Sequence, residues 1–136
     1  MYTKLALFVP ACMLAAVGCS PQKYRVEGIV TFQDGAPVGN AVVEFVPESG
    51  TGTARGKTDR TGKFELSTAG NPGVSAGAYS VGVVQIVVLD GMQDHLRHSK
   101  KREIPKKYNN PATSGIEFSI PVAETITIVI GDDVVI

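Results

Sequence analysis

From Tyr24 to Ile130 the sequence repeatedly alternates β-branched or aromatic residues with polar residues, at a period of two. The clearest example is YRVEGIVTF at 24–32, where one side of the predicted strand carries Tyr24, Val26, Val30 and Phe32. Successive side chains of a strand point to opposite faces, so a period of two buries one face of a sheet. This pattern, without a helical period beside it, restricts the chain to an all-β fold.

Turn residues divide the alternating pattern into segments. We expect a tight turn at Asp34-Gly35. We also expect a hairpin that joins 54–58 to 63–67 through DRTG, in which Asp59 opens the turn with its side chain and Gly62 takes positive φ. The glycine-rich stretch 69–77 is expected to be a loop without regular structure. The other expected strands are 41–46, 78–89, 115–121 and 124–130, with one long connection at 90–111 that carries a short helical turn before Ile104. The sequence therefore predicts a single β-sandwich of about seven strands.

The first 18 residues follow a different pattern. Lys4 is the only charged residue before Lys23, and an uncharged, mainly apolar run extends from Leu5 to Val17. This run is shorter than the roughly 20 residues that a membrane-spanning helix needs. It fits the apolar region of a secretory signal peptide, which is about 7–15 residues long and is followed by small residues at the cleavage site.

The tetrapeptide Ala16-Val17-Gly18-Cys19 resembles the lipobox of bacterial lipoproteins, in which Leu usually stands where this chain has Ala16. The resemblance implies a lipoprotein signal peptide at 1–18, which takes Cys12 with it. It also implies a Cys19 that carries S-diacylglycerol and an N-acyl group, and a lipidated tether at 19–23. The chain would then lie in the bacterial cell envelope, anchored in a membrane and facing the periplasm or the cell surface. The alternatives are an ordinary signal peptide or an uncleaved anchor.

The runs VEGIVTFQDGAPVGNAVVEFVPE, TDRTGKFELST and GAYSVGV resemble the carboxypeptidase regulatory-like, or transthyretin-like (prealbumin-like), domains. The resemblance implies that 24–136 is one Greek-key β-sandwich. In it Gly28 allows a neighbouring chain to approach closely, Pro37 stiffens a turn and Tyr79 anchors the longest strand. These motifs specify a fold, and a fold alone does not specify a function.

Composition excludes several classes of function. Removal of 1–18 removes the single cation Lys4 and leaves a net charge of −1, which argues against a general nucleic-acid binder. One enzymatic branch of the transthyretin-like fold, the hydrolase that opens 5-hydroxyisourate, relies on separated histidines and a C-terminal Tyr-Arg-Gly-Ser. This chain ends in GDDVVI, and its two histidines are three positions apart. We therefore expect a non-enzymatic protein without catalytic residues.

We also expect no metal and no cofactor. His95 and His98, with Asp94, could supply two or three ligands, but a strong zinc site needs three or four with a distant partner, and neighbouring cations oppose it. Asp34, Asp132 and Asp133 lack the spacing of a calcium loop. The histidines are better interpreted as solvated loop residues.

Six cations gather in the long connection: Arg97, Lys100, Lys101, Arg102, Lys106 and Lys107. They could contact anionic lipid or acidic polymers, or they could simply keep an exposed loop solvated, which is the interpretation we favour. The predicted function is a membrane-anchored binding or assembly module for a separate envelope protein. The alternative is a carbohydrate- or cell-wall-polymer-binding lipoprotein that uses 69–77 and the Tyr108-Asn109-Asn110 sequence as a polar-aromatic patch.

Overall fold

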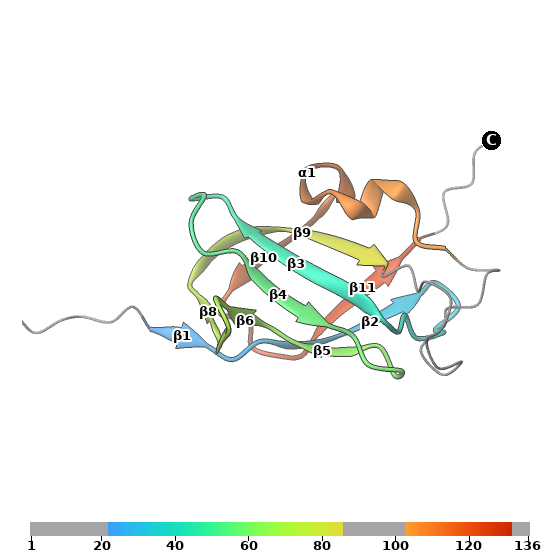
Figure 1. Ribbon diagram of the computed structural model, residues 1–136, viewed down its shortest axis with the longest axis horizontal. Coiled ribbons are helices and arrows are strands. Elements are labelled where there is room, and N and C mark those ends of the chain that lie inside the picture. The colour runs from blue at the N-terminus through green and yellow to red at the C-terminus, as the bar shows by residue number, and fades with distance from the viewer. Residues whose placement is uncertain (1–21, 86–102, 132–136) are drawn as a thin grey trace, which may run out of the picture.

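The computed structural model describes residues 22–85 and 103–131, and these residues form mainly β-strands, which confirms the all-β class (Figure 1). The strands of this part of the chain are β1 (Lys23–Tyr24), β2 (Glu27–Phe32), β3 (Ala41–Pro47), β4 (Ala54–Lys57), β5 (Lys63–Glu65), β6 (Ser67–Thr68), β7 (Asn71–Pro72), β8 (Val74–Ser75), β9 (Gly77–Gln85), β10 (Ile116–Ile120) and β11 (Ile126–Ile130). Two short helical segments precede β10, namely η2 (Lys106–Asn109) and α1 (Pro111–Ser114).

The strands are divided among three sheets. The largest has the order β10-β9-β3-β4-β6-β7, with every neighbouring pair antiparallel. The second has the order β11-β2-β5, in which β11 runs parallel to β2 and β5 runs antiparallel to it. The third is the two-stranded ladder of β1 and β8.

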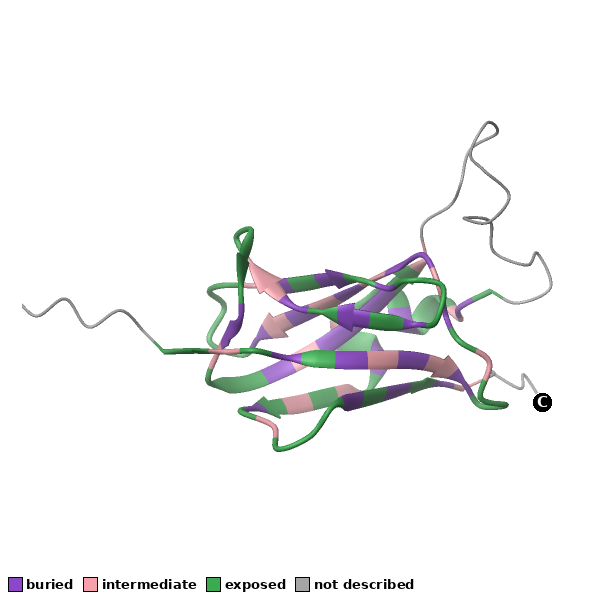
Figure 2. Ribbon diagram, turned by 90° about the horizontal axis from the view of Figure 1, so that it is seen from below, coloured by how far each residue is buried: buried purple, intermediate pink, exposed green. Residues whose placement is uncertain are grey.

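The two larger sheets share one hydrophobic core. Burial alternates along β2, β3 and β11, as the sequence period predicted, and Figure 2 shows these alternating positions on two layers of strands. Val30, Phe45, Val81 and Ile128 are buried and belong to one cluster that both sheets supply. The Phe45 ring packs against Tyr79 and Phe118, with centroids 6.1 Å and 5.9 Å away. Burial of these side chains is the main force that holds the sheets together.

The expectation for Gly28 is confirmed. Gly28 on β2 lies opposite Phe64 on β5, and the Phe64 ring covers the glycine. A Cβ at Gly28 would lie 2.6 Å from Cε1 of Phe64 and 2.8 Å from the carbonyl oxygen of Ile126. A residue with a side chain would therefore push apart the strands on both sides of β2.

The predicted hairpin between 54–58 and 63–67 is wrong in its pairing, although its turn is correct. Asp59 Oδ1 accepts hydrogen bonds from the Thr61 and Lys63 amides at 2.8 Å and 3.1 Å, and Gly62 has φ of 80°. However, β4 pairs with β3 and β6, whereas β5 pairs with β2 in the other sheet. The turn connects two layers. Gly56 allows the layers to meet, because a Cβ there would lie 2.5 Å from the Glu65 carbonyl oxygen.

The prediction that 69–77 lacks regular structure is also wrong. Ala69 and Gly70, with φ of 50° and 79°, form the two-residue turn between β6 and β7. Positive φ at both positions is the geometry that joins two strands most tightly. Val74 in β8 is fully buried. The glycines of this segment supply turns between short strands.

The expected strand at 24–32 is interrupted, because β1 pairs with β8 and only β2 joins the three-stranded sheet. At Asp34-Gly35 only Gly35 has positive φ, of 86°, while Asp34 Oδ1 accepts a hydrogen bond from the Ala36 amide. The helical turn expected before Ile104 lies outside the described residues. In the described ranges, no helix is long and apolar enough to cross a bilayer.

Candidate functional site

The N-terminal entry to the fold is the part of the described structure closest in sequence to the predicted attachment point. Gln22 and Lys23 are exposed, and Lys23 begins β1 at one end of the molecule (Figure 1). Tyr24 pairs with Val74 and packs against the core. Gly73 approaches this strand so closely that a Cβ on it would lie 3.0 Å from the Lys23 Cβ. The chain is therefore part of the fold from its fourth residue after Cys19.

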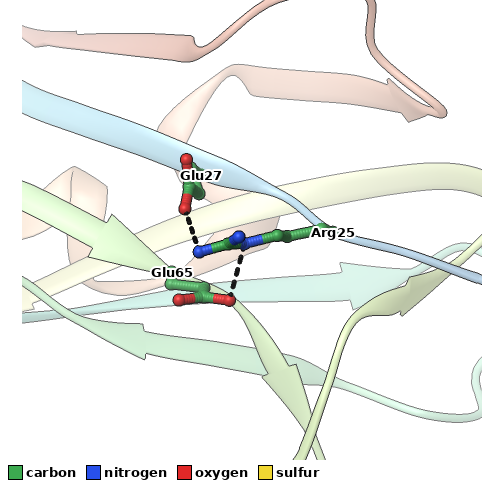
Figure 3. A network of polar contacts seen from close by, with 3 residues as sticks. All are labelled: Arg25, Glu27 and Glu65. Atoms are coloured by element: carbon green, nitrogen blue, oxygen red, sulfur yellow. Dashed lines mark hydrogen bonds and ion pairs between the residues drawn. The ribbon is translucent and has the colours of Figure 1, made fainter.

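An ionic network follows immediately along the chain (Figure 3). Arg25 Nη2 lies 2.6 Å from Glu27 Oε1, and Arg25 Nε lies 3.1 Å from Glu65 Oε1. Glu27 and Glu65 face each other across β2 and β5, where like charges repel. Arg25 contacts both carboxylates, offsets part of this repulsion and links the segment between β1 and β2 to β5. Its side chain is 70% exposed, so water weakens the attraction.

The period of two at 24–32 predicts that Arg25 and Glu27 lie on the side opposite Tyr24 and Val26, and both are exposed. It missed Glu65 as their third partner, and it missed the pairing of β1 with β8. The alternating pattern predicted on which face of the sheet each side chain lies. The partner across the sheet depends on which strand lies next to β2, and no local pattern contained that information.

Two edge strands of the described sheets follow each other along the chain. β10 is the last strand of the six-stranded sheet and β11 is the last strand of the three-stranded sheet, and residues 121–125 connect them. The exposed positions along them include Glu117, Ser119 and Val129, of which Val129 is 50% exposed. An edge strand presents backbone donors and acceptors that a strand of another protein can pair with.

Many of the residues singled out in the sequence lie outside the described ranges. These are Cys19, Asp94, His95, Arg97, His98, Lys100, Lys101, Arg102, Asp132 and Asp133. Lys106 and Lys107 are described. Both are exposed in η2, and Lys107 Nζ lies 5.1 Å from the centroid of the Tyr108 ring.

The two parts of the expected polar-aromatic patch are not brought together. Residues 69–77 lie beside β1, near the start of β2. Tyr108 lies near the other end of β2, because its hydroxyl accepts a hydrogen bond of 3.0 Å from the Gly131 amide, directly after Ile130, which pairs with Phe32. The Tyr108 side chain is also buried, so its ring is not available for stacking on a sugar.

The shifted titratable groups of the described residues have structural causes. The hydroxyl of Thr61 donates to Asp59, and this bond, helped by the Lys63 and Thr61 amides, lowers the pKa of the Asp59 carboxyl. Burial raises the pKa of Tyr79, whose hydroxyl donates to the Ser75 carbonyl oxygen at 2.8 Å. In 22–85 and 103–131, no group of three His, Cys, Asp or Glu side chains is close enough to hold a metal ion.

Comparison with family models, with curated proteins and with solved structures gives no match for this chain.

Proposed function

We propose that this protein is a membrane-anchored envelope lipoprotein without enzymatic activity, and that its β-domain is a binding or assembly module for another envelope protein. One observation carries the proposal. The fold begins at β1, whose first residue, Lys23, is exposed and lies four residues after the Cys19 of a lipobox-like sequence. A lipidated residue at that position needs an exposed chain entry beside it. Two or more acyl chains give stable membrane attachment, since each buried CH₂ contributes about 0.8 kcal/mol.

The domain itself is proposed to be a transthyretin-like Greek-key sandwich. In support, the connections from β2 to β3, from β4 to β5 and from β10 to β11 all pass between the two larger sheets. Seven of the described strands have three or more residues, and the other four have two residues each. Such a scaffold offers loops and edges, and its described titratable groups stabilise turns and strands.

The lipid anchor is tested by mass spectrometry of the protein purified from membranes of a bacterium that processes lipoproteins. We expect a chain that begins at Cys19 and carries the mass of a diacylglyceryl and an acyl group. Cys19→Ser should abolish processing and lipid attachment. Cys12→Ser is the matched control and should change neither. An unmodified thiol at Cys19, or an intact first residue, would disprove the anchor.

The protein partner is expected at the edge strands β10 and β11. A photoreactive residue at Ser119 should crosslink one predominant protein in intact cells, whereas the same residue at Arg60, in the exposed turn after β4, should not. Ser119→Lys should weaken the association measured with the purified pair, because a charge on an edge strand opposes pairing with another strand. Equal crosslinking from both positions would argue against an edge-specific contact.

A further inference from the structure

The described strands have two distinct ends. β1 and β8 lie at the end where β2 starts and where β3 and β10 finish, because Glu27 pairs with Glu65, Pro47 with Tyr79 and Ile120 with Gly77. We call this the tether end. It includes the connections 48–53, 69–73 and 121–125. The opposite end, here the far end, includes the turns 33–37 and 59–62 and the segment η2, which Tyr108 links to Gly131. Figure 1 shows the tether end on the left and the far end on the right.

The chain cannot swing freely between β1 and the larger sheets. The β1–β8 ladder holds residues 23–24, and Arg25 contacts Glu27 and Glu65. The amide of Leu66 then donates to the Val26 carbonyl oxygen at 2.9 Å. Only three residues, 20–22, separate Cys19 from this fixed chain entry. Four peptide units span at most about 14 Å.

The far end lies farther from β1 than the short tether can reach. β2 has six residues, and at about 3.3 Å per residue it is about 20 Å long. An acylated Cys19 would therefore hold the tether end within about 14 Å of the lipid, and only the far end could extend about 20 Å beyond it.

The surface of the tether end suits this position. Its three connections have the sequences ESGTGT, AGNPG and PVAET, in which Glu48 and Glu124 are the only charged residues. These three connections contain no aromatic residue to insert into acyl chains and no Lys or Arg to adsorb on anionic lipid. Distance to the membrane is then set by the covalent tether.

We propose that the tether end of this domain faces the head groups of the membrane that holds the anchor, and that the far end is directed away from it. This inference depends on the proposed acylation of Cys19. The ladder of β1 with β8 is the element that gives the anchored protein its orientation.

The test uses the full chain, processed in a bacterial host, with one added cysteine at Thr51→Cys on the tether end or at Arg60→Cys on the far end. Both positions are exposed. The acylated Cys19 has no free thiol and Cys12 leaves with the signal peptide, so a fluorophore attaches only to the new cysteine. The labelled proteins are placed in phosphatidylcholine vesicles that carry an acceptor dye on a fraction of their head groups.

Energy transfer from position 51 to the head groups should be at least about twofold stronger than from position 60, given a difference in height of about 20 Å. Insertion of a long Gly-Ser linker between Gln22 and Lys23 should reduce this difference. High salt should not change it, because the orientation has no electrostatic cause. If the protein floats with the vesicles but energy transfer from position 51 is equal to or weaker than that from position 60, the proposed orientation is wrong and the anchor is not affected. Loss of flotation would overturn the anchor, and the orientation with it.

Discussion

At the scale of single residues, glycine and aspartate decide how closely the strands can approach and how the chain reverses. Gly28 is required because Phe64 and the Ile126 carbonyl occupy the space of a Cβ on two sides of β2. The sequence motif predicted a close approach at Gly28. It did not reveal that a phenylalanine ring from β5 makes it, since that requires the register of Gly28 with Phe64.

Gly28→Ala should lower the free energy of unfolding by about 2–3 kcal/mol, the upper part of the range for overpacking a core. In a Phe64→Leu background the same change should cost less, because the ring that opposes the methyl group is gone. Urea denaturation of the four proteins of this double-mutant cycle measures the coupling. Additive losses would mean that Phe64 does not limit the space at Gly28.

Asp59 should make stability depend on pH in the acid range. Its pKa is lowered in the fold from 3.8, chiefly by the Thr61 hydroxyl. The contribution of the carboxylate is therefore fully present above the unfolded pKa and is lost as the pH falls through the lower folded value.

Asp59→Asn should destabilise the protein at pH 7, and the difference from the native chain should shrink as the pH falls below about 3.8. Thermal unfolding across this range measures it, with Arg60→Gln as the control for a charge in the same turn. A difference that stays constant down to the lowest pH would show that ionisation of Asp59 contributes nothing.

At the scale of elements, the alternating pattern predicted most strands well, because burial of one face depends on local order along the chain. Strand pairing was less predictable. The turn at Asp59–Gly62 has the composition of a hairpin turn, yet β4 and β5 enter different sheets because each finds its neighbours among distant strands. In 69–77, a high glycine content was interpreted as lack of order, whereas Val74 and the turn at Ala69-Gly70 indicate short strands.

The β6–β7 turn offers a stabilising substitution. Ala69 has φ of 50°, a conformation that costs alanine energy and that asparagine tolerates better. Ala69→Asn creates Asn-Gly, the preferred sequence for this turn, and should raise stability by about 0.5–1 kcal/mol. Gly70→Ala, at φ of 79°, should lower the stability. Differential scanning calorimetry measures both. A destabilising Ala69→Asn would contradict the assigned turn.

At the scale of the whole molecule, the side chains packed between the two larger sheets contribute most of the stability. Phe45 lies on β3, in the interior of the six-stranded sheet, and is fully buried against Tyr79 and Phe118. Phe45→Ala should cost about 3–5 kcal/mol, a large part of the 5–15 kcal/mol typical of a domain. The exposed Val129→Ala should change stability by less than about 0.5 kcal/mol. Comparable losses from both changes, measured by urea unfolding, would contradict this distribution.

The candidate site was predictable only in part at this scale. Cys19 stays a prediction from a local sequence signature, whereas the end of the domain at which the described chain starts depends on the pairing of β1 with β8, about fifty residues later in the chain. The proposed patch of 69–77 with Tyr108 failed for the same reason, because closeness in space was assumed from composition alone.

The parallel pairing of β11 with β2 has a consequence for biogenesis. The final described strand completes a sheet with one of the first, so residues 126–130 must be synthesised before Val30 can be enclosed on both sides. Contacts between such remote segments form slowly. Completion of the three-stranded sheet is therefore expected to be a late step of folding.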